Sequence, residues 1–414
     1  MSLDVLEFNP FLPEVHADPY PQYERLRRLE PVHPGLMPGV WILTRYADCQ
    51  AVLKDAERFG SDARKGDLFQ QFRQMQGGTE RFFERDEARS MLFLDPPDHD
   101  RLRRIVSKAF TARVVEAMRP HIHEIVDGLL DGIEERGPGE FDLVADLAYP
   151  LPIVVICEML GVPPEDQDRF RRWSADVVLS LDPIMDLSVM DKAEAASMAL
   201  REYFGELVAA RRAHPRSDLL TGLIAAEEQG ERLNQEELLT TCVLLLVAGH
   251  ETTVNLISNG VLALLRNRDQ WERLRAGVNR PGVLRTAVEE LLRYDSPVQF
   301  TGRTVLADVE IGGVAIRRGQ ELVCIVGAAN RDPDQFPDPD RLDIGRQENR
   351  HLAFSGGIHF CLGAPLARTE AQVLFGELVR RLPDLELAGG ELERRETITL
   401  RGLKRLPVRF GTSA

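Results

Sequence analysis

The feature that most constrains the fold is a run of about thirty residues that starts after Asn234 and ends near Leu265. Asn234 is a typical helix cap, and Glu237, three residues on, can complete a capping box. The middle of the run, residues 244–248, reads Leu-Leu-Leu-Val-Ala and is apolar on every side. A helix without a polar face has to be buried. The run therefore predicts a long central helix deep inside the protein.

Directly after the apolar stretch, residues 249–253 read Gly-His-Glu-Thr-Thr. Glycine inside a helix costs roughly 1 kcal/mol relative to alanine, and buried polar groups cost more unless they are satisfied. A local violation of this kind often marks a functional site. We expect the Thr252 hydroxyl to bond back toward Ala248 and to open the helix locally, which leaves room for a small ligand and water. Glu251 and Thr252 could then relay protons to that ligand.

Two other interpretations of this segment compete. One is a kinked core helix with a solvated Glu251. The other is a zinc protease, because His250 and Glu251 begin an HExxH pattern. That pattern needs a second histidine at position 254, where this chain has Val254, so the zinc protease lacks a necessary ligand.

The rest of the chain is mainly helical, with short β-rich parts. Apolar residues recur at helical spacing between about residues 98 and 280, in stretches that include 101–110, 114–135, 151–160 and 194–212. Apolar residues punctuated by glycines indicate strands at about 31–45, 303–326 and 385–410. Residues 331–350, rich in proline and aspartate, are predicted to be irregular. No linker rich in Pro, Gly or Ser divides the chain, so we predict a single, mainly α domain over residues 1–414.

Composition argues against several classes of function. The formal net charge of −15 disfavours a general affinity for nucleic acid. The N-terminal segment, Met1 to Glu7, has no basic region and no long apolar run, so we expect neither a signal peptide nor a membrane anchor. The five cysteines are scattered and lack CxxC spacing, which disfavours a disulfide framework or a zinc cluster. We therefore expect a cytoplasmic protein that acts as a monomer.

Cys361 is the candidate metal ligand. It follows glycines at 356 and 357 and precedes Gly363, and glycines let a backbone lie close to a flat ligand. Pro365 suits the first turn of a helix, so Cys361 is expected just ahead of a helix N-terminus, where a thiolate is favoured. With one such cysteine, the metal must bring its other ligands, as haem iron does. The alternative is a buried cysteine before an amphipathic helix.

This segment resembles the haem-binding loop of the cytochrome P450 family. The family pattern is Phe-Gly-x-Gly-x-His-x-Cys-x-Gly with Ala-Arg a few residues on, and it is matched at Phe354, Gly357, His359, Cys361, Gly363, Ala367 and Arg368. Ser355 departs from the usual glycine. The resemblance implies the P450 fold, an α-rich body with a small β region. It also implies haem b between the central helix and the helix after Cys361, with Cys361 as the axial ligand and Phe354 and Gly363 beside the cofactor.

The central helix matches a second family motif, Ala-Gly-x-(Asp/Glu)-Thr, at Ala248, Gly249, Glu251 and Thr252. The resemblance implies that Ala248 contacts the haem, that Thr252 supports oxygen activation and that Glu251 helps to supply protons.

Three further motifs carry the resemblance along the chain. It implies that His99 and Arg103, in Asp-Pro-Pro-x-His-x-x-x-Arg, bind the haem propionates together with Arg303 and His359. It also implies that Glu290 and Arg293 form a buried pair, joined by an arginine from the irregular segment, here Arg341, which would hold the haem loop. The alternatives are an ordinary helix start for His99 and a solvated surface pair for Glu290 and Arg293.

One predicted helix region is basic in an otherwise acidic chain, through Arg101, Arg103, Arg104, Lys108 and Arg113. In the family this helix borders the face where the electron donor docks, which implies a ferredoxin or flavodoxin partner. A solvated run of charges is the alternative.

Apolar residues gather in segments 66–93 and 177–190, which correspond to the family's distal loop and lid, and residues 298–301 (Val298, Gln299, Phe300 and Thr301) would line the pocket from the side. They suit a hydrophobic substrate such as a macrolide, terpenoid, steroid or fatty acid, although each residue also suits a plain core.

The resemblance covers essentially the whole chain. It implies a soluble bacterial monooxygenase that inserts one oxygen atom of O2 into a hydrophobic small molecule, with electrons from a separate ferredoxin and its reductase. Two alternatives are a peroxide-driven enzyme of the same fold, against which the Glu251–Thr252 pair counts, and a non-enzymatic haem-binding sensor.

Overall fold

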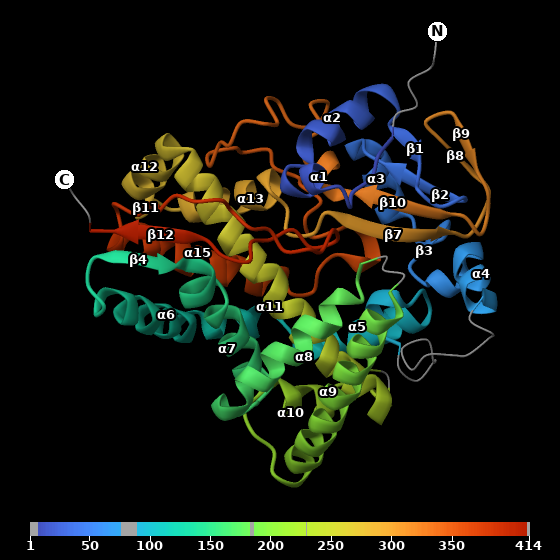
Figure 1. Ribbon diagram of the computed structural model, residues 1–414. Coiled ribbons are helices and arrows are strands. Elements are labelled where there is room, and N and C mark those ends of the chain that lie inside the picture. The colour runs from blue at the N-terminus through green and yellow to red at the C-terminus, as the bar shows by residue number, and fades with distance from the viewer. Residues whose placement is uncertain (1–6, 76–88, 183–185, 229, 412–414) are drawn as a thin grey trace.

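The computed structural model describes residues 7–75, 89–182, 186–228 and 230–411. Its central helix, α11 (Gln235–Arg266), runs diagonally through the middle of the molecule (Figure 1). Asn234 accepts the backbone N–H of Glu237, and the Glu237 carboxylate accepts the N–H of Asn234 in return, so the predicted capping box is present. Most side chains of α11 are buried. The predicted central helix is therefore confirmed.

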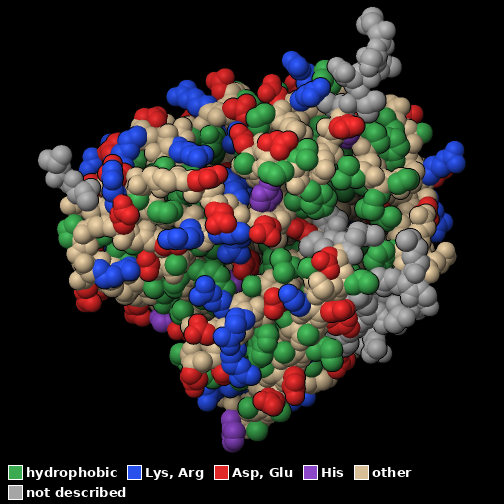
Figure 2. All heavy atoms as spheres, viewed as in Figure 1, with side chains coloured by type: hydrophobic (Ala, Val, Ile, Leu, Met, Phe, Trp, Pro, Cys, Tyr) green, Lys and Arg blue, Asp and Glu red, His purple; other side chains and the backbone are tan. Residues whose placement is uncertain are grey.

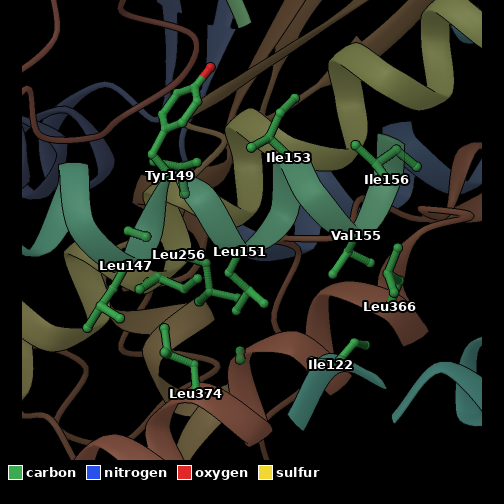
Figure 3. Close-up of a cluster of buried hydrophobic side chains, with 14 of the residues drawn as sticks. Ile122, Leu147, Tyr149, Leu151, Ile153, Val155, Ile156, Leu256, Leu366 and Leu374 are labelled. Carbon is green, nitrogen blue, oxygen red and sulfur yellow. The ribbon is translucent and has the colours of Figure 1, made fainter. Parts of the chain in front are cut away.

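Long helices enclose α11, and their apolar faces meet around it. Figure 3 shows Leu256 of α11 beside Leu147 and Leu151, with Leu374 of the helix that follows Cys361 below them. The helices that pack on α11, or on each other beside it, are α6 (Ala112–Glu134), α7 (Pro150–Met159), α8 (Gln167–Leu179), α9 (Leu187–Ala213), α12 (Arg268–Gly277), α13 (Val283–Tyr294) and α15 (Ala364–Arg381). The predicted helical stretches 114–135, 151–160 and 194–212 fall within one residue of these bounds or inside them.

Shorter helices cover the ends of the molecule. They are α1 (Pro13–Ala17), α2 (Tyr20–Leu29), α3 (Tyr46–Lys54), α4 (Asp67–Met75), α5 (Asp98–Ala109), α10 (Leu219–Ala225) and α14 (Val326–Ala329). The predicted helix 101–110 corresponds to α5, which begins three residues earlier, at Asp98. In Figure 1, α1 to α3 lie at the end that holds most of the strands, and α8 to α10 form the opposite end.

The main sheet has the strand order β1-β2-β10-β7-β3. Its strands are β1 (Val32–Pro34), β2 (Val40–Leu43), β3 (Phe59–Gly60), β7 (Phe300–Val305) and β10 (Glu321–Ile325). Leu322 of β10 faces Trp41 of β2 in parallel register and Arg303 of β7 in antiparallel register. Two small hairpins are formed by β5 (Glu227–Glu228) with β6 (Glu231–Arg232) and by β8 (Val309–Ile311) with β9 (Val314–Ile316). The β-rich parts predicted at 31–45 and 303–326 are confirmed.

The last predicted β region, 385–410, is strand only at its two ends. A three-stranded sheet joins β11 (Glu386–Leu387), β12 (Pro407–Phe410) and β4 (Gly139–Asp142). Between β11 and β12 the chain makes only isolated bridges, Val298 to Leu400 and Arg394 to Leu403. We call residues 394–402 the C-terminal loop. Its side chains contact α11, which is why it does not continue as a regular strand pair.

Within the described residues, α11 is also long and apolar enough to cross a membrane, but 72% of its most apolar stretch is buried inside the protein. That burial is typical of a core helix. On the face shown in Figure 2, Lys and Arg side chains lie among Asp and Glu side chains. The net charge of −15 is therefore not gathered into one patch on that face.

Candidate functional site

Cys361 lies at the end of a tight loop that leads into α15. Its backbone N–H donates to the carbonyl of Phe354 at 2.9 Å, which closes the loop. Gly357 has a φ of +62°, and a Cβ there would lie 2.4 Å from the carbonyl oxygen of Leu53, so this position requires glycine. The helix begins at Ala364, as the sequence predicts. The loop therefore presents the Cys361 sulfur at the start of α15.

The predicted effect of the helix start on Cys361 is present, but burial opposes it. Burial raises the pKa of the Cys361 thiol above its usual value, and this effect outweighs the backbone N–H groups of Gly363 and Ala364, which lower it. Arg103 and Arg368 also lower it, by their charge. The helix start therefore moderates the cost of a thiolate here without removing it, and a bound cation is needed to stabilise the charged sulfur.

Two histidine rings lie against each other beside this loop. The ring centroids of His99 and His359 are 4.3 Å apart, and among the described residues the buried Nε2 atom of each ring has no hydrogen-bond partner. The pKa of His359 is lowered to about 3, first by burial and then by the positive charges of Arg303 and His99. Arg103 adds to the effect and donates to the carbonyl of Phe360 at 2.6 Å. The structure thus brings together His99, Arg103, Arg303 and His359, as predicted.

This cluster fits an anionic group. Buried ring nitrogens without partners are costly, and buried cations that repel one another need a negative counter-charge. Arg303 is buried, and burial lowers the pKa of its guanidinium. Among the described residues no three His, Cys, Asp or Glu side chains gather as a metal site, so a metal held by Cys361 must bring other ligands. Haem, with iron for the sulfur and carboxylates for the cationic cluster, fits both observations.

On α11, the Thr252 hydroxyl donates to the carbonyl of Ala248 at 2.9 Å, as predicted. The helix nevertheless stays continuous from Gln235 to Arg266, so the expected local opening appears only as this side-chain bond and not as a break in the helix. Gly249 has a packing role as well, because a Cβ there would lie 3.3 Å from Ile156 of α7.

Glu251 is buried and ion-paired, not solvated. Only 1% of it is exposed, and its Oε2 accepts from Arg395 of the C-terminal loop. Burial raises the pKa of Glu251, but His250, whose Nε2 lies 3.5 Å from Oε1, and the charge of Arg395 outweigh it and lower the pKa. The His250 ring, in turn, lies within hydrogen-bonding distance of Tyr149 at 3.3 Å and Ser174 at 3.4 Å. Neither Arg395 nor His250 was predicted as part of the site.

The loop before Cys361 is anchored by a buried carboxylate. Arg293 donates to both oxygens of Glu290, at 2.8 and 2.9 Å, and both side chains are fully buried. The predicted third member was wrong, because Arg346 and not Arg341 contacts Glu290, at 3.1 Å. Arg341 takes part only through its backbone carbonyl, which accepts from Arg293 at 3.3 Å. The irregular chain from 337 to 346 folds back on itself, which places the later arginine at the carboxylate.

A second anchor was not predicted. Arg368 of α15 donates to both oxygens of Glu289, at 2.6 and 2.9 Å, and its guanidinium lies 4.5 Å from the ring centre of Phe354. His351 contacts the same carboxylate at 3.1 Å. Burial raises the pKa of Glu289, but the bonds from His351 and Arg368 prevail and lower it to about 2. The motif arginine therefore holds the loop in place and does not reach toward a ligand.

Ser355 adopts a φ of +61°, a conformation that suits glycine, and its buried hydroxyl has no partner. We expect Ser355→Gly to raise the free energy of unfolding by about 0.5–1 kcal/mol, because it relieves the strain and removes an unsatisfied group. Ser107→Gly in α5 is the matched control, and it should lower the free energy of unfolding by about 0.5 kcal/mol, because glycine is a poor helix former. Urea unfolding measures the free energy of unfolding of both variants. A lower value for Ser355→Gly than for the unsubstituted protein would contradict the claim that the backbone is strained at Ser355.

The substrate side of the site is described only in part. Residues 76–88 of the predicted distal loop and 183–185 of the predicted lid lie outside the described residues. Two of the predicted pocket residues also contact α2. Gln299 accepts from Tyr23 at 3.1 Å and donates to the carbonyl of Ser296 at 2.7 Å, and the Phe300 ring packs against Tyr23 at 6.4 Å. Gln299 and Phe300 also line a cavity together with residues of the C-terminal loop. Their contact with a substrate stays a prediction.

Comparisons with known proteins show which chains this one resembles. Residues 37–387 match the family model described as Cytochrome P450. Cytochrome P450 107B1 of Saccharopolyspora erythraea is 45% identical over 402 residues, 95% of each chain. The vitamin D(3) 25-hydroxylase of Pseudonocardia autotrophica is 44% identical over 400 residues, 95% of this chain and 94% of that one. The structure of P450BioI in complex with a hexadec-9Z-enoic acid ligated acyl carrier protein has a TM-score of 0.85 at 38% identity and covers 96% of this chain and 100% of that one.

Proposed function

Because the chain belongs to the cytochrome P450 family, we propose that it binds haem b through Cys361 and that Glu251 and Thr252 serve the reaction. The protein is a monooxygenase that transfers one oxygen atom from O2 to a hydrophobic small molecule. The observation that supports the assignment most directly is the pair of buried, unpartnered ring nitrogens on His99 and His359 beside the Cys361 loop.

In this proposal Cys361 binds the iron, and His99, Arg103, Arg303 and His359 hold the propionates. Phe354, Gly363 and Ala248 would lie against the ring, and a Cβ at Gly363 would meet the Cys361 sulfur at 3.8 Å. Haem, when bound, would supply the redox-active iron at which O2 is reduced, with electrons that come from a separate donor.

In this proposal Thr252 and Glu251 of α11 transfer protons. The Thr252 hydroxyl proton is engaged with the carbonyl of Ala248, so the lone pairs of Oγ1 remain available to accept a proton or a hydrogen bond on the pocket side. Glu251, next along the helix, has one carboxylate oxygen with no hydrogen-bond partner in the described structure. In this proposal that oxygen takes up a proton and passes it on.

The substrate class is hydrophobic. The vitamin D(3) hydroxylase and the fatty-acyl complex among the relatives act on or bind apolar molecules, and the apolar residues of the distal loop and lid segments suit such a ligand. We propose a free polyketide, steroid-like or fatty-acyl substrate within this class.

We propose that electrons come from a separate ferredoxin or flavodoxin that docks on the Cys361 side. Arg104, Lys108 and Arg113 are exposed on α5 and at the start of α6, and Phe360 of the haem loop is 43% exposed. An acidic donor would be steered to this surface. Arg104→Gln with Lys108→Gln should slow reduction by ferredoxin several-fold at low salt, in stopped-flow measurements. An unchanged rate of reduction would show that the electron donor does not dock on α5.

The same proposal places the protein in the cytoplasm as a monomer without a membrane anchor or nucleic-acid partner. The net charge of −15 and five cysteines that all remain free support it.

The experiment that tests the function is Thr252→Ala, assayed with ferredoxin, its reductase and NADPH. We expect NADPH consumption to continue while product falls about tenfold or more and hydrogen peroxide accumulates, because proton delivery loses its hydroxyl. Thr253→Ala is the matched control on the same turn, since its hydroxyl donates to Gly249 at 3.3 Å. Activity with peroxide alone, unaffected by Thr252→Ala, would favour a peroxide-driven enzyme instead.

A further inference from the structure

The C-terminal loop lies on the face of α11 that carries Glu251. Glu251, Asn255 and Asn259 are spaced by four residues and so share one helix face. Asn259 Nδ2 donates to the carbonyl of Arg401 at 2.8 Å. Gly402 approaches the helix so closely that a Cβ there would lie 1.8 Å from Asn255 Oδ1. The loop is therefore fixed against α11 at its far end, beyond Glu251.

The tip of the same loop is held by a residue that follows α8. Asp182 accepts the backbone N–H groups of Ile398 at 3.0 Å and Thr399 at 2.8 Å, one on each carboxylate oxygen. The Thr399 hydroxyl donates to the carbonyl of Leu181 at 3.1 Å. Asp182 is buried, so these bonds are shielded from water. The conformation of the loop thus depends on a carboxylate from a distant part of the chain.

Arg395, which precedes both attachments in the chain, reaches Glu251, and its backbone N–H donates to the carbonyl of Gly402 at 3.2 Å. Glu251 Oε2 accepts from Arg395 Nη1, while Oε1 has no hydrogen-bond partner among the described residues and lies 3.5 Å from His250 Nε2. Tyr149 also faces this carboxylate: burial first, and the charge of Glu251 second, raise the pKa of the Tyr149 hydroxyl. His250 and Arg395 therefore compensate the buried charge of Glu251 together, and Arg395 is the member of the pair that is always charged.

We propose that Arg395 is a positioning residue for the proton-relay acid Glu251 and that Asp182 acts through the C-terminal loop to hold Arg395 there. The inference rests on the proposed role of Glu251. The segment after α8 is thereby linked to proton delivery through three contacts: Asp182 to the loop tip, the loop to Arg395, and Arg395 to Glu251. Movement of Asp182 would release Arg395 and leave the buried carboxylate without its counter-charge.

The first test is Arg395→Met, with coupling measured as product formed per NADPH across about pH 6 to 8. In the unsubstituted protein the pKa of Glu251 is held low, so coupling should vary little over this range. Loss of the cation should raise the pKa of Glu251 and make coupling depend on pH, because burial then favours the protonated acid. Arg409→Met is the matched control, since Arg409 pairs with Glu386 on the surface of the same segment.

The second test is Asp182→Asn, which keeps the size of the side chain and puts an N–H donor where one of the two oxygens accepts. We expect amide hydrogen exchange of residues 396–400 to speed up by about tenfold and coupling to shift in the same direction as in Arg395→Met. Asp186→Asn is its control, because Asp186 also accepts a backbone N–H, from Ser188 at 2.8 Å, but caps α9.

The outcomes separate this inference from the proposed function. The new pH dependence of Arg395→Met should vanish when Glu251→Gln is added, since both act on one carboxylate. Persistence of that dependence in the double variant, or coupling in Asp182→Asn equal to that of Asp186→Asn, would overturn the inference. Each variant should retain the reduced carbon monoxide band of thiolate-bound haem. Absence of that band from the unsubstituted protein would instead overturn the proposed function.

Discussion

Glu290→Ala should lower the free energy of unfolding by about 3–5 kcal/mol, because it leaves a fully buried arginine without its carboxylate. Glu290 accepts from Arg293 twice, from Arg346, from Asn349 at 3.0 Å and from the backbone N–H of Asp343 at 2.9 Å. Arg293 also donates to the carbonyls of the irregular segment, so loss of its partner should loosen the approach to the haem loop. Urea unfolding followed by circular dichroism measures the stability, and the haem band measures cofactor retention.

Glu289→Ala is the control for this prediction. It removes the neighbouring carboxylate, but the Arg368 side chain is 29% exposed, so water can hydrate its guanidinium once Glu289 is gone. We expect a loss of about 1–2 kcal/mol there, in keeping with a half-buried pair. Equal effects of the two substitutions would show that burial of Arg293 does not set the cost, and the account of the Glu290 anchor would then be wrong.

The difference between these anchors shows what the sequence can and cannot predict. Glu290 and Arg293 are three residues apart on one helix, so helical geometry alone predicts their contact. Arg346 reaches them from an irregular segment, whose path depends on turns and backbone bonds that no periodic pattern encodes. The prediction of Arg341 failed for that reason. The more general prediction, that an arginine from this segment completes the anchor, is confirmed by Arg346.

For Glu251, too, the sequence pattern predicts the contacts within its own helix but not those made by irregular segments. The run around Glu251 marks a functional site because polar residues interrupt an apolar helix. Its charge partner, Arg395, lies in a loop with no regular pattern and is brought to α11 by Asn255, Asn259 and Asp182. Sequence spacing within one helix predicts the bond from Thr252 to Ala248, but tertiary contacts decide that Glu251 is ion-paired.

Cys361→Ala should abolish monooxygenase activity, with a loss of at least about a thousandfold, while the fold persists. The sulfur is the only thiol of the loop and so the one group there that can give thiolate-ligated haem, and the loop backbone is closed by the bond between Cys361 N–H and Phe354, which alanine keeps. The carbon monoxide difference spectrum of the dithionite-reduced protein should show a red-shifted Soret band in the unsubstituted protein and none in the variant. Circular dichroism should show the same helical content in both.

Cys157→Ala separates loss of a ligand from loss of a buried thiol. Cys157 is fully buried in α7, where burial raises the pKa of its thiol to about 12, so it behaves as a small apolar side chain. Its replacement should cost about 1 kcal/mol of stability and leave the band unchanged. If Cys361→Ala kept the red-shifted band, another residue would have to hold the iron. Because none of the other four cysteines stands at this loop, that result would refute the site assigned to Cys361.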